Sequence, residues 1–286
     1  MNENDAKQKQ MYNKSEGLQG VPIMENMIDR RTFLSLTAGG SLASLMIGHP
    51  LMNLAMAATE NPDIKAIAFD GFPLFDPRSI MGEVKEIIPE NGGAFGKAWF
   101  DKIFAYTWLR TSAEQYKGFH GTVADALDYT AEDLKITLRT DQRDRLLNIW
   151  LQLKLWPDVM QALKVFKNNG IRLGFLSNLS EEMLRTNTRN NDIENAFEFY
   201  LSTDVVQAFK PDPRAYQMGV DAFQLPKRNI AFAAFGAWDA AGASWFGYPT
   251  VWVNRFGRPV EKLDSGPIVT GRNIETLVDF VVRKKG

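Results

Sequence analysis

Short apolar stretches alternate with helical stretches along most of this chain, and no other feature constrains its fold as strongly. The predicted strands lie at 64–69, 171–176, 197–201, 229–235 and 250–253. The predicted helices lie at 159–168, 181–190, 213–223, 239–246 and 274–283. Such alternation is typical of an α/β protein with a doubly wound parallel sheet, a Rossmann-like core flanked by helices.

The alternation is interrupted after the first strand. Residues 78–155 contain no second strand of that buried kind, and their apolar side chains follow helical spacing, as Phe95, Trp99 and Ile103 do. We therefore expect an α/β core made of residues 62–77 and 156–286, with a helical cap inserted at 78–155.

Polar residues follow the predicted strands, where ligands bind in open parallel sheets. Asp70 ends the first strand, and Ser177 and Asn178 end the second. Lys210 precedes a helix, and Asp239 lies late in the sheet. These five residues are the candidate site.

Composition excludes several classes of site and partner. The chain has 33 basic and 34 acidic residues, and the resulting net charge of −1 argues against a nucleic-acid partner. It has no cysteine and only two histidines, which excludes thiol nucleophiles and cysteine-based metal sites and makes a multi-histidine metal site improbable.

The N-terminal segment, residues 1–58, is typical of a targeting signal rather than of a folded domain. Arg30 and Arg31 precede a moderately apolar run that contains glycines and Pro50 and ends in AMAA. This pattern resembles a twin-arginine export signal, which implies cleavage near Ala58, a periplasmic or other extracytoplasmic location and no permanent membrane span. An ordinary amphipathic or disordered N-terminus is the alternative.

Short motifs between residues 69 and 243 resemble those of a known enzyme family. Residues 69–70 read FD, residues 176–178 read LSN, and residues 106–110 read YTWLR. Residues 210–216 read KPDPRAY, and residues 237–243 read AWDAAGA. Together they resemble the haloacid dehalogenase superfamily, and most closely its type II (S)-2-haloacid dehalogenases. The resemblance implies a small-molecule substrate, no cofactor and, by analogy, a homodimer.

The resemblance also implies a role for each candidate residue. Asp70 would attack the halogen-bearing carbon and form an ester that water hydrolyses, without a metal. Lys210 would be its charge partner. Ser177 and Asn178 would donate hydrogen bonds to the nucleophile or the substrate. Asp239 would position the hydrolytic water or Lys210, unless it only caps a helix.

A second set of residues would form the substrate pocket. Tyr216 would orient Lys210 or the substrate carboxylate. Trp238 and Phe119 match aromatic wall positions of the family pocket, although ordinary core packing would explain them equally well. Phe72 and Phe100 would widen the mouth and make it more apolar.

The chain departs from the family at several anion-binding positions. The first motif, residues 70–76, reads DGFPLFD; it is one residue short, and the family's threonine falls on Pro73. The cap arginine becomes Phe100, and a serine and an asparagine are missing from 234–239, AFGAWD. Phe72 also replaces the second aspartate of the superfamily's phosphatases, and Phe235 a metal-binding carboxylate, which argues against magnesium-dependent phosphoryl transfer.

Two hypotheses remain open from these departures. One is a dehalogenase-type hydrolase with an altered, less anionic substrate. The other is a catalytically degenerate protein that binds an apolar ligand or a partner. Arg78 or Lys102 is the predicted replacement for the missing cation, if the first hypothesis holds.

Overall fold

A six-stranded parallel sheet forms the core of the computed structural model, which describes residues 62–282. Its strand order is β5-β4-β1-β6-β7-β8. The strands are β1 (Ala66–Phe69), β4 (Arg172–Ser177), β5 (Phe199–Ser202), β6 (Ile230–Ala234), β7 (Thr250–Val253) and β8 (Val269–Gly271). The predicted doubly wound parallel sheet is confirmed.

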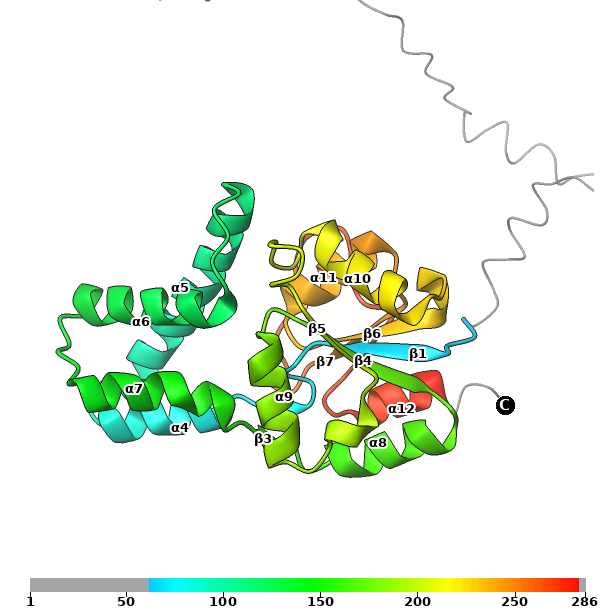
Figure 1. Cartoon of the computed structure of the whole chain (residues 1–286), viewed down its shortest axis with the longest axis horizontal. Coiled ribbons are helices and arrows are strands. Elements are labelled where there is room, and N and C mark those ends of the chain that lie inside the picture. Colours follow the sequence, from blue (N-terminus) through cyan, green and yellow to red (C-terminus); the bar gives the residue numbers. More distant parts are fainter. Residues whose placement is uncertain (1–61, 283–286) are drawn as a thin grey trace, which may run out of the picture. The chain divides into compact units, whose positions relative to one another are not determined.

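Helices cover both faces of this sheet (Figure 1). They are α8 (Val159–Asn168), α9 (Glu181–Asn190), α10 (Pro213–Phe223), α11 (Ala237–Phe246) and α12 (Glu275–Val281). Successive side chains of a strand point to opposite faces. Ile67 and Phe69 of β1 accordingly enter the apolar core under α8, α9 and α12, while Ala66 and Ala68 enter the core under α10 and α11.

Local sequence explains where these helices begin. Ser180 caps α9, because its hydroxyl accepts a hydrogen bond from the Met183 N–H at 3.2 Å. Asp212 caps α10 in the same way, and Pro213 occupies the first turn, where an N–H would have no partner. The bounds of α8, α9 and α10 coincide with the predicted ones.

The segment between the first two core strands is mostly helical. Its helices are α4 (Arg78–Ile87), α5 (Gly92–Ser112), α6 (Phe119–Asp133) and α7 (Thr140–Asn148), and they lie to one side of the sheet (Figure 1). Helices α5 and α6 are tied together by the Trp99 indole, which donates to the Val123 carbonyl at 3.0 Å. We call this helical segment the cap.

Several short elements were not predicted. The chain enters and leaves the cap through an antiparallel pair, β2 (Phe75–Asp76) and β3 (Lys154–Leu155). Single 3₁₀ turns lie at η1 (Ile149–Leu151), η2 (Glu194–Ala196) and η3 (Lys227–Asn229). Strand β8 and these pieces span only two or three residues, which is too short to show a period in the sequence.

The predicted twin-arginine signal lies outside the described residues and stays a prediction. Within residues 62–282, no helix is both long enough and apolar enough to cross a lipid bilayer.

Candidate active site

The predicted site residues meet at the carboxyl ends of neighbouring strands. Asp70 directly follows β1, and Ser177 is the last residue of β4, which pairs with β1. Asp239 lies in the first turn of α11, which follows β6 on the other side of β1. Parallel pairing therefore brings Asp70 close to two residues that lie more than a hundred positions later in the sequence.

Lys210 joins the two aspartates. Its Nζ donates to Asp70 Oδ1 at 2.8 Å and to Asp239 Oδ2 at 2.6 Å. The whole lysine is 0% exposed. A buried charge is tolerated only when it is paired and hydrogen-bonded, and here one ammonium serves two carboxylates.

Electrostatics keeps this lysine protonated. Burial by itself lowers the pKa of Lys210, but the charges of Asp239 and Asp70 outweigh burial and hold it above its ordinary value. Burial raises the pKa of Asp239 to about 6, against the opposing attraction of Lys210. The pKa of Asp239 thus rises mainly because of burial, and the negative charge of Asp70 raises it further.

Tyr216 holds the other oxygen of Asp239. Its hydroxyl donates to Asp239 Oδ1 at 2.8 Å, and its side chain is completely buried. Tyr216 is thus placed next to Asp239 and does not line the cavity described below. The helix-cap alternative for Asp239 is not seen, because Gly236 is the N-cap of α11.

Ser177 and Asn178 complete the polar cluster. The Ser177 hydroxyl donates to Asp70 Oδ1 at 3.3 Å and accepts from the Leu179 N–H at 3.2 Å. Asn178 Oδ1 accepts from the Lys210 backbone N–H at 3.0 Å. Its buried Nδ2 has no hydrogen-bond partner, which leaves one donor available at the site.

Asp70 faces a small, mainly aromatic cavity, which we call the inner cavity. Its volume is about 130 Å³. It is lined by Asp70, Phe72, Phe100, Phe104, Phe119, Ser177, Asn178, Leu179, Phe235, Gly236 and Trp238. Four of the five predicted pocket residues therefore line it, with Tyr216 the exception. Phe104 was missed, although it lies one helical turn after Phe100 in α5.

Comparison with known proteins assigns the family. A family model described as haloacid dehalogenase-like hydrolase matches residues 46–247. The chain belongs to this family. Haloacetate dehalogenase H-2 of Moraxella sp. (strain B) is 34% identical over 219 residues, which are 76% of this chain and 98% of the relative. An (S)-2-haloacid dehalogenase of Pseudomonas sp. (strain YL) is 36% identical over 71% of this chain and 88% of its own.

Solved structures support the same family. The crystal structure of an L-2-haloacid dehalogenase superposes with a TM-score of 0.75 at 33% identity, covering 77% of this chain and 99% of the other. This haloacid dehalogenase-like hydrolase thus shares sequence and fold with proteins named as 2-haloacid dehalogenases. The predicted resemblance is confirmed.

In this haloacid dehalogenase-like hydrolase, neither residue that was predicted to replace the family's arginine lies at the inner cavity. Arg78 donates from Nε to Asp76 at 2.8 Å and stacks over Trp156. The Lys102 ammonium lies 3.7 Å from the centre of the Tyr129 ring. Neither residue lines the inner cavity, so this hypothesis about the missing arginine is wrong.

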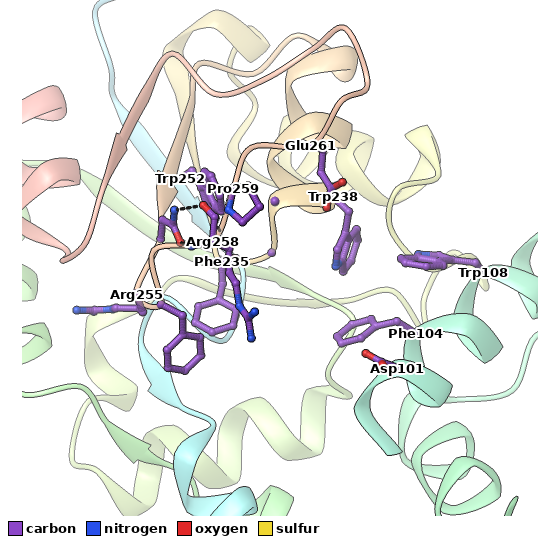
Figure 2. Close-up of a pocket in the computed structure, with 14 residues that line it drawn as sticks. Asp101, Phe104, Trp108, Phe235, Trp238, Trp252, Arg255, Arg258, Pro259 and Glu261 are labelled. Atoms are coloured by element: carbon purple, nitrogen blue, oxygen red, sulfur yellow. Dashed lines mark hydrogen bonds between the residues drawn. The ribbon is translucent and has the colours of Figure 1, made fainter. Parts of the chain in front are cut away.

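A second space adjoins the inner cavity of the hydrolase, and we call it the outer chamber. Its volume is about 640 Å³ (Figure 2). It shares four lining residues with the inner cavity, namely Phe104, Phe235, Gly236 and Trp238. The two spaces are therefore neighbours, and we call the boundary formed by these four residues the neck.

Within residues 62–282, no group of three or more histidine, aspartate or glutamate side chains is arranged to hold a metal ion. Asp70 and Asp239, the carboxylates at the site, both bind the ammonium of Lys210.

Proposed function

We propose that this protein hydrolyses a carbon–halogen bond through an ester on Asp70, without a metal. The observation that carries the proposal is the asymmetry of the Asp70 carboxylate. Oδ1 is held by Lys210 at 2.8 Å and by Ser177 at 3.3 Å. Oδ2 has only a long contact of 3.4 Å with the Phe72 N–H and is the oxygen free to react.

In the first step, Asp70 Oδ2 attacks the halogen-bearing carbon. The carbon–oxygen bond forms as the carbon–halogen bond breaks, and the halide leaves with the bonding electron pair. Lys210 and Ser177 hold Oδ1, which fixes the direction of the attacking lone pair. The free Nδ2 of Asn178 is a donor that this step can use for the substrate or the departing halide.

In the second step, water attacks the carbonyl carbon of the Asp70 ester. The ester bond breaks, the alcohol product leaves, and the Asp70 carboxylate is regenerated. The overall balance is one organic halide and one water giving one alcohol, one halide ion and one proton. Both oxygens of Asp239 are already bonded, to Lys210 and Tyr216, which favours the positioning of Lys210 as its role.

Residue chemistry supports the metal-independent mechanism. The Lys210 ammonium lies between Asp70 and Asp239, where it supplies the positive charge that balances the nucleophile. Phe72, which stands where the superfamily's phosphatases carry a second aspartate, lines the inner cavity with an apolar ring.

The lining also supports an altered substrate. The relatives are named for haloacetate and 2-haloacids, in which the carboxylate adjoins the reacting carbon. No cationic side chain of the described residues lines the inner cavity, and Phe100 replaces the expected arginine. Burying an unpaired carboxylate costs several kcal/mol, so short 2-haloacids should be poor substrates.

The test measures halide release by the full chain from bromo acids of several lengths and their amides. Asp70→Asn is the control and should abolish release. A single turnover in ¹⁸O-water should place ¹⁸O in the side chain of Asp70, because water attacks the ester carbonyl. Release that persists in Asp70→Asn, or ¹⁸O found only in the product, would reject the mechanism.

A further inference from the structure

The outer chamber contains a cation that the inner cavity lacks. Four charged residues line this chamber, namely Asp101, Arg255, Arg258 and Glu261. Two of them are already paired within the protein. Lys97 donates to Asp101, and Arg255 donates to Asp158 and, at 2.8 Å, to the Pro73 carbonyl.

Arg258 is the unpaired cation of the chamber. No carboxylate of residues 62–282 forms a salt bridge with its guanidinium, and Glu261 does not pair with it. Figure 2 shows its side chain pointing into the space bounded by Phe235 and Phe104, whereas Glu261 lies on the side of Trp238. An anion that enters the chamber therefore meets an available guanidinium.

The loop after β7 fixes the backbone of this arginine. Asn254 Oδ1 accepts from the Arg258 N–H at 2.8 Å, and Asn254 Nδ2 donates to the Arg258 carbonyl at 2.8 Å. Gly257 supplies the left-handed conformation that the loop needs just before it, with φ at +61°. A side chain on an anchored backbone loses less entropy on binding a ligand than one on a free loop.

The inner cavity and the outer chamber would hold different parts of one substrate. The halogen-bearing carbon has to reach Asp70 in the inner cavity, where the walls are mainly aromatic. A carboxylate on the adjacent carbon would remain among those rings without a cation. A carboxylate at the end of a longer apolar chain would cross the neck and reach Arg258.

We propose that Arg258 binds the carboxylate of a haloacid whose halogen-bearing carbon is several carbons away from that carboxylate. This inference rests on the hydrolysis proposed above and names its substrate class. Arg258 is thereby a specificity-determining residue, because guanidinium and carboxylate form paired, charge-assisted hydrogen bonds.

The test compares 6-bromohexanoate with 6-bromohexanamide, which is similar in size and uncharged. Arg258→Gln should raise KM for the acid by roughly ten- to a hundred-fold, as expected for a lost charge-assisted hydrogen bond, with little change in kcat. KM for the amide should not change. Lys262→Gln is the matched control, because it removes one charge from the same loop at a residue that does not line the chamber.

A binding measurement keeps this inference separate from the proposed reaction. Hexanoate carries no halogen, and its binding to the full chain can be followed by the fluorescence of Trp108 and Trp238, which line the chamber. Arg258→Gln should move the midpoint of the fluorescence titration to a hexanoate concentration roughly ten- to a hundred-fold higher than in the wild type. Lys262→Gln should leave the titration unchanged.

The outcomes distinguish a failure of the Arg258 proposal from a failure of the proposed hydrolysis. Asp70-dependent release of bromide with KM for the acid unchanged in Arg258→Gln, or raised equally in Lys262→Gln, overturns the role of Arg258 and keeps the hydrolase. Arg258-dependent binding of hexanoate without bromide release from any bromo acid overturns the hydrolase and keeps an anion site. If the protein neither binds hexanoate nor releases bromide, both proposals are overturned.

Discussion

The Phe100 ring stacks on Trp150, with centroids 5.5 Å apart and planes 27° from parallel. Trp99 and Phe119 also pack edge-on against Trp150, and Phe100 and Phe119 of this aromatic cluster line the inner cavity. The resemblance places an anion-binding arginine at position 100. An aromatic ring there carries no charge, and under the proposed function it would contact an apolar segment of the substrate.

Phe100→Arg should restore the recognition of short haloacids. A guanidinium at this wall would pair with the carboxylate of 2-bromopropanoate, and KM should fall about ten-fold or more. The lost ring pairing should lower the free energy of unfolding by about 0.5–1.5 kcal/mol, and burial of the guanidinium should add to this loss. Steady-state halide release and urea unfolding measure the two effects. Phe100→Met is the apolar control, and equal KM values for both variants would contradict the prediction.

Lys210→Met should destabilise the protein in a pH-dependent way. Without the ammonium, Asp70 and Asp239 are buried without a cation, which costs about 3–5 kcal/mol near neutral pH. The pKa of Asp239, about 6 with the lysine present, should rise further, because the charge of Lys210 lowers it. The folded variant then binds protons more readily than the unfolded chain, so its free energy of unfolding should increase as pH falls from about 7 to 5.

Urea unfolding of wild type and Lys210→Met at both pH values measures this deficit. The exposed Lys262→Met is the matched control and should show no deficit at either pH. A deficit of equal size at both pH values would show that lost packing, rather than uncompensated carboxylates, explains the instability.

Tyr216→Phe should change the pH profile without changing substrate affinity. The hydroxyl hydrogen bond lowers the pKa of Asp239, so its loss should move the acid limb of kcat upward from about pH 6. We expect kcat to fall about ten-fold and KM to stay constant, because Tyr216 does not line either space. Tyr248→Phe is the control, since that hydroxyl donates to the Tyr216 carbonyl and not to Asp239. A change in KM alone would contradict a positioning role.

Periodicity predicted the core elements because each is long enough to show a pattern. The buried strand β7 and the helices α8 and α9 appear at their predicted bounds. The pair β2 and β3 could not be predicted, because two residues carry no period and their pairing depends on contacts across the whole cap.

The polar cluster could be predicted because most of its residues lie at the carboxyl ends of strands in a parallel sheet. Parallel strands end at one edge, so Asp70 and Ser177 had to lie close together once the sheet was correct. The direction in which a side chain points could not be predicted from its position in the sequence. Arg78 is near the first motif in sequence but pairs with Asp76. The position of Arg258 depends on a loop that Asn254 and Gly257 help to shape, and its sequence showed no period.

Glu261→Gln should strengthen the binding of anionic substrates. Glu261 lines the outer chamber with Arg258 and repels a carboxylate that enters it. Removing this charge should lower KM for 6-bromohexanoate by a few-fold at low ionic strength, and the gain should largely disappear near 1 M salt, where the Debye length is about 3 Å. Asp264→Asn is the matched control, because it removes one negative charge from the same loop outside the chamber, and asparagine tolerates the positive φ of 52° found there. An equal gain in both variants would assign the effect to net charge, and a gain that persists in high salt would contradict an electrostatic origin.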